Sequence, residues 1–182
     1  MLGALALVLA DQTAQAVAAA AGQSASAAAA LSALAQFLDR PTLDQLRQVL
    51  GLTPSGAVRL VDRLVEAGLV SRGPGADGRS RAVQLTAQGR RVAARIAHAR
   101  ARLLTGALAG LSGADRAVLR DLLGRVMANV VQAKEGGPWT CRLCDLTACG
   151  RAGGHCPAAT AAAAKYGDFS AAGGSSGGRP PH

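Results

Sequence analysis

The junction between residues 42–68 and residues 69–91 constrains the fold of this chain more than any other feature. The first segment has the pattern of two short amphipathic helices separated by a turn at Gly51. The second segment carries several arginines and alternates apolar with polar residues, which is typical of a short two-stranded hairpin. A helix pair followed at once by a basic hairpin is the outline of a winged helix-turn-helix.

Capping signals predict where the two helices begin and end. Thr42, followed three residues later by Gln45, has the pattern of a capping box. Thr53 with Pro54 starts the second helix, and Gly68 ends it. The residues expected to face inward are Leu43, Leu46, Val49 and Leu50 in the first helix and Val58, Val61, Leu64 and Val65 in the second.

A different side of the second helix carries polar and charged residues. Ser55, Arg59 and Arg63 are spaced by four, so they share a solvent-facing side. Asp62 and Glu66 lie beside them and are placed to form local ion pairs with the arginines.

The hairpin is predicted to consist of two strands, one beginning at residues 69–70 and the other spanning residues 81–85. Residues 73–78, which are rich in glycine and proline, are expected to form the tip between them.

Long helices are predicted on both sides of this unit, over residues 4–37 with a break at 22–26, over 87–111, and over 113–134. Their apolar stripes exceed what one small core can absorb, and a two-fold dimer interface is the economical solution. The fold class expected is therefore mainly α with a small β-wing, dimerised through its N- and C-terminal helices. The stripe residues are Leu31, Leu34 and Leu38, then Val92, Ile96, Ala99, Leu103 and Leu104, and finally Val118, Leu119, Leu122, Val126 and Val130.

The chain divides into five predicted regions. They are an N-terminal dimerisation region (1–38), the winged helix-turn-helix (39–90), C-terminal dimerisation helices (91–135), a Cys-rich segment (136–160) and a disordered tail (161–182).

Positive charge is concentrated in the winged unit. The whole chain has a formal net charge of +9, and residues 39–102 alone hold twelve arginines against five acidic residues. Such a segment is expected to bind a polyanion, because neutralising phosphates releases counterions. A solvated basic face is the alternative, but here the arginines fall on the elements that enter DNA grooves.

The sequence resembles the MarR family of bacterial transcription regulators over about residues 30–135. The resemblance lies in residues 52–70, in the Asp-x-Arg pattern of Asp77 and Arg79, and in residues 83–86 with Gly89 opening the next helix. It implies a dimer whose N- and C-terminal helices interlock. It also implies a recognition helix in the major groove and a wing arginine in the adjoining minor groove of double-stranded DNA.

The candidate DNA-binding residues follow from groove geometry. Ser55 and Gly56 are short and let the backbone approach base edges, while Arg59 is long enough to reach guanine or phosphate. Arg63 is expected to contact phosphate, unless it is an ion-paired surface residue.

The wing supplies the remaining candidates. Arg79 suits a narrow minor groove, whose negative potential attracts a guanidinium, and Asp77 is expected to orient it. Arg72 and Arg81 are expected to contact the DNA backbone.

Four cysteines, Cys141, Cys144, Cys149 and Cys156, form a C-x2-C-x4-C-x6-C pattern after the last long helix. Four soft ligands in a short loop suit a tetrahedral zinc ion, with an iron–sulfur cluster or metal-free redox thiols as alternatives. The segment lies outside the usual MarR pattern. It is a candidate site through which a metal, an oxidant or another small effector regulates the protein.

The function expected is that of a transcription regulator, a repressor in the first instance, and not of an enzyme. His98 and His182 have no acid or base partner nearby in sequence, and four cysteines would close a zinc sphere that catalysis needs open. A metal- or redox-dependent enzyme and a winged helix that binds only protein remain the alternatives. The first ten residues lack a basic region and end at Asp11, so a cytoplasmic protein without a membrane span is expected.

Overall fold

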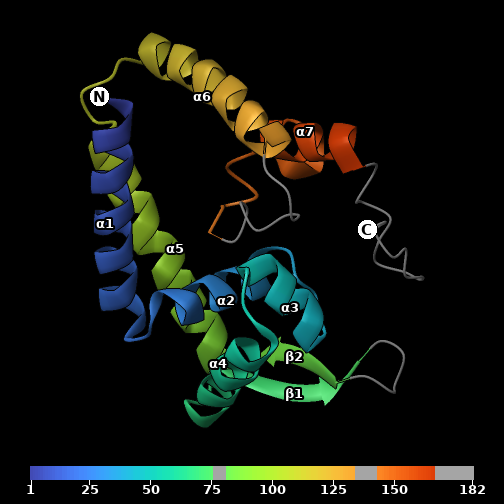
Figure 1. Ribbon diagram of the computed structural model, residues 1–182. Helices are drawn as coiled ribbons and strands as arrows, with labels where there is room; N and C mark the ends of the chain where they lie inside the picture. The colour runs from blue at the N-terminus through green and yellow to red at the C-terminus, as the bar shows by residue number, and fades with distance from the viewer. Residues whose placement is uncertain (76–80, 134–142, 167–182) are drawn as a thin grey trace.

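The computed structural model describes residues 1–75, 81–133 and 143–166 and shows a mainly helical chain with one two-stranded antiparallel sheet (Figure 1). Its elements are α1 (Leu2–Ala21), α2 (Ala25–Gln36), α3 (Leu43–Leu50), α4 (Pro54–Glu66), β1 (Val70–Pro74), β2 (Arg81–Leu85), α5 (Ala87–Ala107), α6 (Gly113–Ala133) and α7 (Pro157–Tyr166). The predicted fold class, with its β-wing, is confirmed.

Helix α2 forms the centre of the main core. Small side chains let its neighbours approach closely, and residues 27–33 are all buried. Ser24 caps its amino end by accepting a hydrogen bond from the Ala27 N–H at 3.3 Å. Gly22 ends α1 in the left-handed conformation, so the predicted break between the two helices is confirmed.

Helices α1 and α5 lie side by side (Figure 1). Val17 and Ala21 are the buried residues of α1, and its amino-terminal half stays exposed. By length and composition alone α1 is able to cross a bilayer. The same test is passed by a helix whose apolar side is covered by protein, and α1 already packs along α5.

The winged unit is built as the capping signals predict. Thr42 and Gln45 form a complete capping box on α3, with hydrogen bonds of 2.9 and 3.2 Å. The hairpin pairs Val70 with Leu85 and Pro74 with Arg81, so β1 runs through Gly73 and Pro74. The predicted tip at 73–78 therefore starts too early, and residues 76–80 lie outside the described residues.

Helix α5 begins where the hairpin returns to the core. Thr86 caps it by accepting from the Gly89 N–H at 3.0 Å. A Cβ at Gly89 would lie 1.9 Å from the Leu69 carbonyl oxygen, so only glycine permits this contact between α5 and the start of the wing. The helix ends at Ala107, four residues before the expected position.

Helix α6 leaves the winged unit and packs on α7 at the far end of the molecule (Figure 1). A capping box at Ser112 and Asp115 starts it as predicted. Helix α7 was not predicted: residues 161–166, assigned to the tail from sequence, are helical. The rest of that tail, 167–182, lies outside the described residues.

Candidate nucleic-acid interface

Helix α4 presents its amino-terminal turn to solvent. Thr53 caps the helix by accepting a hydrogen bond from the Gly56 N–H at 3.1 Å, and Pro54 occupies the first turn. Ser55 is exposed and Gly56 partly exposed, so short side chains surround this end of the helix. A second backbone can approach here closely, as contact with base edges requires.

The buried side of α4 differs in part from the sequence expectation. Val61 and Leu64 face the core as predicted, and the other buried residues are Ala57 and Leu60. Val58 and Val65 were expected inside but are 41% and 38% exposed. The side of α4 that carries both leucines is buried, because two leucines bury more apolar area than the two valines.

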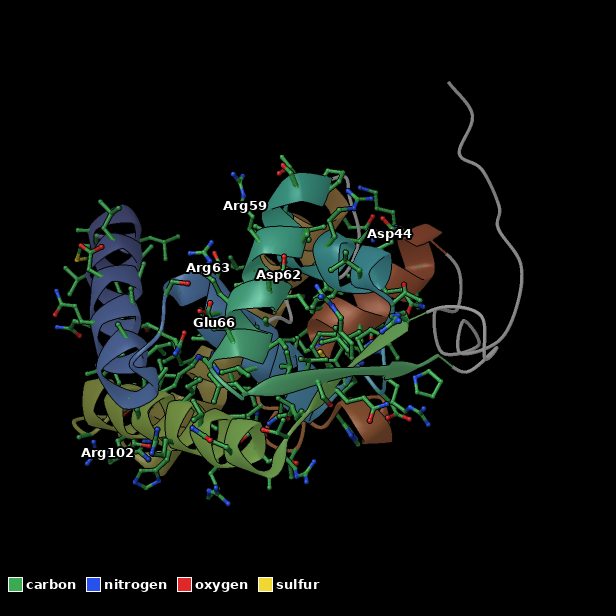
Figure 2. All side chains as sticks on the ribbon, turned by 90° about the horizontal axis from the view of Figure 1, so that it is seen from below. Asp44, Arg59, Asp62, Arg63, Glu66 and Arg102 are labelled. Carbon is green, nitrogen blue, oxygen red and sulfur yellow. The ribbon has the colours of Figure 1, made fainter. Side chains whose placement is uncertain are left out.

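The exposed side of α4 carries two arginines. Figure 2 shows Arg59 and Arg63 leaving the same side of the helix. The Arg63 Nε donates a hydrogen bond to the Arg59 carbonyl oxygen at 3.2 Å. In the described part of the chain neither guanidinium forms an ion pair, so both charges remain available to an external anion.

Asp62 binds an arginine of the wing and not one of its own helix. The Arg72 guanidinium lies 2.5 Å from the Asp62 carboxylate, which joins β1 to α4. The expected pairing of Asp62 with Arg59 or Arg63 is therefore wrong. Arg72 remains exposed, but any contact with DNA competes with this ion pair.

The base of the wing carries two further cations. Arg81 is exposed at the start of β2. Arg40, which the sequence analysis did not select, donates to the Pro74 carbonyl oxygen at 2.8 Å and fixes the end of β1. Its positive φ of 47° in a non-glycine residue is the structural feature that draws attention to it. Asp77 and Arg79, at the tip, lie outside the described residues.

Val58 is a candidate contact residue that sequence reasoning missed. It lies on the exposed side of α4 next to Arg59, three residues after Ser55. An apolar side chain at this position suits contact with a thymine methyl group in the major groove. The sequence alone does not separate this role from a buried one, because the spacing of Val58 also fits the predicted buried stripe.

The structure does not assemble the expected metal site from described residues. Cys144 and Cys149 are partly exposed and Cys156 is buried. Across residues 1–75, 81–133 and 143–166, no three His, Cys, Asp or Glu side chains are grouped to hold one ion. Cys141, the first of the four predicted ligands, lies outside that part of the chain.

Together, the capped helix with an exposed basic side and the adjoining two-stranded wing define a winged helix-turn-helix protein. Residues 21–80 match the MarR family. This part of the chain is therefore similar to a family of winged-helix transcription regulators, whose members are not enzymes.

Solved structures show the same winged-helix fold. Rv1404 from Mycobacterium tuberculosis is 26% identical, with 70% of this chain and 88% of that chain covered and a TM-score of 0.61. A MarR family protein from Bacillus stearothermophilus is 22% identical, with coverages of 71% and 89% and a TM-score of 0.64. The reduced form of Escherichia coli MarR is 24% identical, with coverages of 69% and 96% and a TM-score of 0.57. The last two comparisons bear on the fold alone. A search of curated proteins found no match.

Proposed function

We propose that the protein represses transcription in the cytoplasm by binding a pseudo-palindromic operator as a homodimer. The observation that carries the proposal is the exposed side of α4. There Arg59 and Arg63 form no ion pair with any residue that the structure describes, and they follow an amino-terminal turn with short side chains. A helix of this kind fits the major groove, whose base edges carry a distinct donor and acceptor pattern.

The dimer is supported by apolar surfaces that the single chain leaves exposed. Val118, Leu122 and Val126 on α6 are 60%, 49% and 45% exposed. Leu2, Leu5 and Val8 on α1 are exposed as well. Exposed apolar rows on two helices that flank a winged unit suit a symmetric partner, which would bury both.

Each candidate residue has a proposed role. Ser55 and Gly56 allow close approach, while Arg59 and Val58 read bases. Arg63 and Arg81 contact phosphates, and Arg72 does so when it leaves Asp62. Arg79 enters the minor groove, oriented by Asp77.

Duplex binding at several salt concentrations tests the proposal. Affinity of the wild-type protein should fall steeply with salt, and Arg63→Ala should reduce the slope of log affinity against log salt by about 1. Arg102→Ala is the matched control, because this exposed arginine lies on α5, well away from α4 in Figure 2. Binding that is weak and equally salt-dependent in all three proteins would overturn the proposal.

We also propose that Cys141, Cys144, Cys149 and Cys156 bind one zinc ion and make the regulator sensitive to metal or to oxidation. The spacing of the four thiols supports zinc, and an iron–sulfur cluster is the alternative. Because no three ligand side chains are grouped among the described residues, the ion would itself have to draw the ligands together, as small zinc sites do. Metal analysis of protein purified with and without oxygen should give about one zinc per chain. A visible absorption band in the anaerobic sample would favour the cluster.

A further inference from the structure

Residues 143–151, here called the strap, lie against the carboxyl end of α2, next to the winged unit, although they follow the last dimerisation helix. The Leu146 N–H donates a hydrogen bond to the Gln36 side-chain oxygen at 3.2 Å. The Arg151 guanidinium lies 6.0 Å from the centre of the Phe37 ring. Leu143 packs against the main core. The strap therefore contacts the carboxyl end of α2 at two positions and the main core at a third.

The strap has a defined internal structure. The Asp145 carboxylate accepts from the Thr147 and Ala148 N–H groups, each at 3.0 Å. The Cys149 N–H donates to the Asp145 carbonyl oxygen at 3.1 Å. Gly150 then reverses the chain with a φ of 65°. These bonds make the segment a compact turn, so a change at one cysteine shifts its neighbours as well.

The other end of the strap is anchored on α6 and α7. Cys156 is buried with Val131 and Ala161, and Cys149 packs against the same small cluster. In Figure 1 the orange trace between α7 and α2 connects the two parts of the molecule. The strap thus joins the α6–α7 cluster to the winged unit through a segment that carries Cys144 and Cys149.

The contact point on α2 is close to the DNA-binding elements. Six residues after Gln36, Thr42 starts α3 and bridges to Ala82 of β2. The Pro41 carbonyl oxygen accepts from the Val83 N–H at 2.9 Å. A displacement of the end of α2 is therefore transmitted to α3 and the wing through short, hydrogen-bonded connections.

We propose that the strap sets the orientation of the winged unit relative to the dimerisation helices. Two lobes bind one operator well only when their spacing matches the half-sites. Releasing the strap frees each lobe and weakens binding to the complete operator, while one lobe still binds a half-site as before. The inference rests on the proposed operator binding, and the coupling itself rests on the contacts of the strap with α2.

Leu143→Asn tests the coupling without changing the net charge. On a duplex selected by the wild-type protein from a random pool, the variant should bind about tenfold more weakly. Its affinity for a single half-site should be unchanged. Thr147→Ala, at an exposed position in the same strap, is the matched control and should behave as wild type.

Gln36→Ala provides a second test that leaves the strap sequence intact. It removes the acceptor of the Leu146 N–H, so hydrogen exchange at this amide should become faster and operator affinity should fall in the same direction. Circular dichroism of both variants should match the wild type. If both variants are folded and bind the operator with wild-type affinity, the strap has no coupling role.

Absence of duplex binding by the wild-type protein would overturn the proposed function together with the coupling. Duplex binding that both Leu143→Asn and Gln36→Ala leave unchanged would overturn the coupling alone.

Discussion

Apolar side chains are buried in the winged unit but exposed on helix α6. In the winged unit, Leu46, Val61 and Leu64 are completely buried within one chain. On α6, Val118 and Leu122, which are four residues apart on one side of the helix, remain 60% and 49% exposed. The comparison shows that the winged unit completes its core within the single chain, with residues of α1, α2 and α5, whereas α6 has a surface that the described part of the chain does not cover.

The largest expected effect is in the core of the winged unit. Leu64→Ala should lower the free energy of unfolding by about 2–5 kcal/mol, because it removes a completely buried side chain and leaves a cavity. Chemical denaturation should show the same loss in energy at every protein concentration. A loss that varies with concentration would mean that Leu64 contributes to an interface, and the comparison would fail.

Two glycines of α5 distinguish the part of that helix packed on the wing from the part that is open. Gly89→Ala should destabilise by about 3 kcal/mol, because its Cβ would collide with the Leu69 carbonyl oxygen. Gly106→Ala meets nothing within 4 Å and should stabilise the helix by up to about 1 kcal/mol. Thermal unfolding of both variants checks the opposite signs, and equal effects would contradict the packing described for Gly89.

A polar substitution on α6 should affect assembly and leave the winged unit intact. Leu122→Asp should shift sedimentation from dimer to monomer at micromolar concentration, because a charge in an apolar interface is poorly solvated. The same substitution at Leu119, which is partly buried in the same helix, is the variant for comparison. A variant that remains dimeric would show that the exposed stripe of α6 is not the interface.

The smallest expected effect concerns the start of α6. The Ser112 hydroxyl and N–H both donate to Asp115 and lower the pKa of its carboxyl group. A lowered pKa in the folded state stabilises at neutral pH, and this contribution is lost as the pH falls through that pKa. Acid titration of unfolding should therefore show a slightly smaller pH dependence below about pH 4 in Asp115→Ala than in wild type. An unchanged pH dependence would mean that the capping box at the start of α6 contributes nothing to the stability of the protein.

Elements with strong local signals could be predicted from the sequence. Thr42, Thr53 and Thr86 each cap the helix that follows, and the structure contains all three caps. Such signals act within four residues, so they require no knowledge of the tertiary fold. The limits of α3 and α4 followed from them almost to the residue.

The choice between two sides of one helix could not be predicted in the same way. Helix α4 has apolar residues on more than one side, and its spacing allows Val58 or Leu60 to face the core. Helix α7 is not predicted for a different reason. Its alanine-rich sequence begins at Pro157, a favoured first residue of helices, but the expected boundary at residue 160 divides it between the Cys-rich segment and the tail.

Long-range contacts gave no sequence signal at all. Asp62 pairs with Arg72 across the turn into β1, and Leu146 bonds to Gln36 across 110 residues. The candidate DNA-binding arginines were therefore predictable as residue types on an exposed helix, whereas their partners depended on tertiary packing.

Base preference of the Arg59→Ala variant tests the central claim most directly. Competition between a selected operator and versions with single base changes should be measured for wild type, Arg59→Ala and Arg102→Ala. If the exposed side of α4 reads bases, Arg59→Ala should lose about 1–3 kcal/mol of discrimination at one position of each half-site, and Arg102→Ala should lose none. Full discrimination by Arg59→Ala at every position would contradict the account.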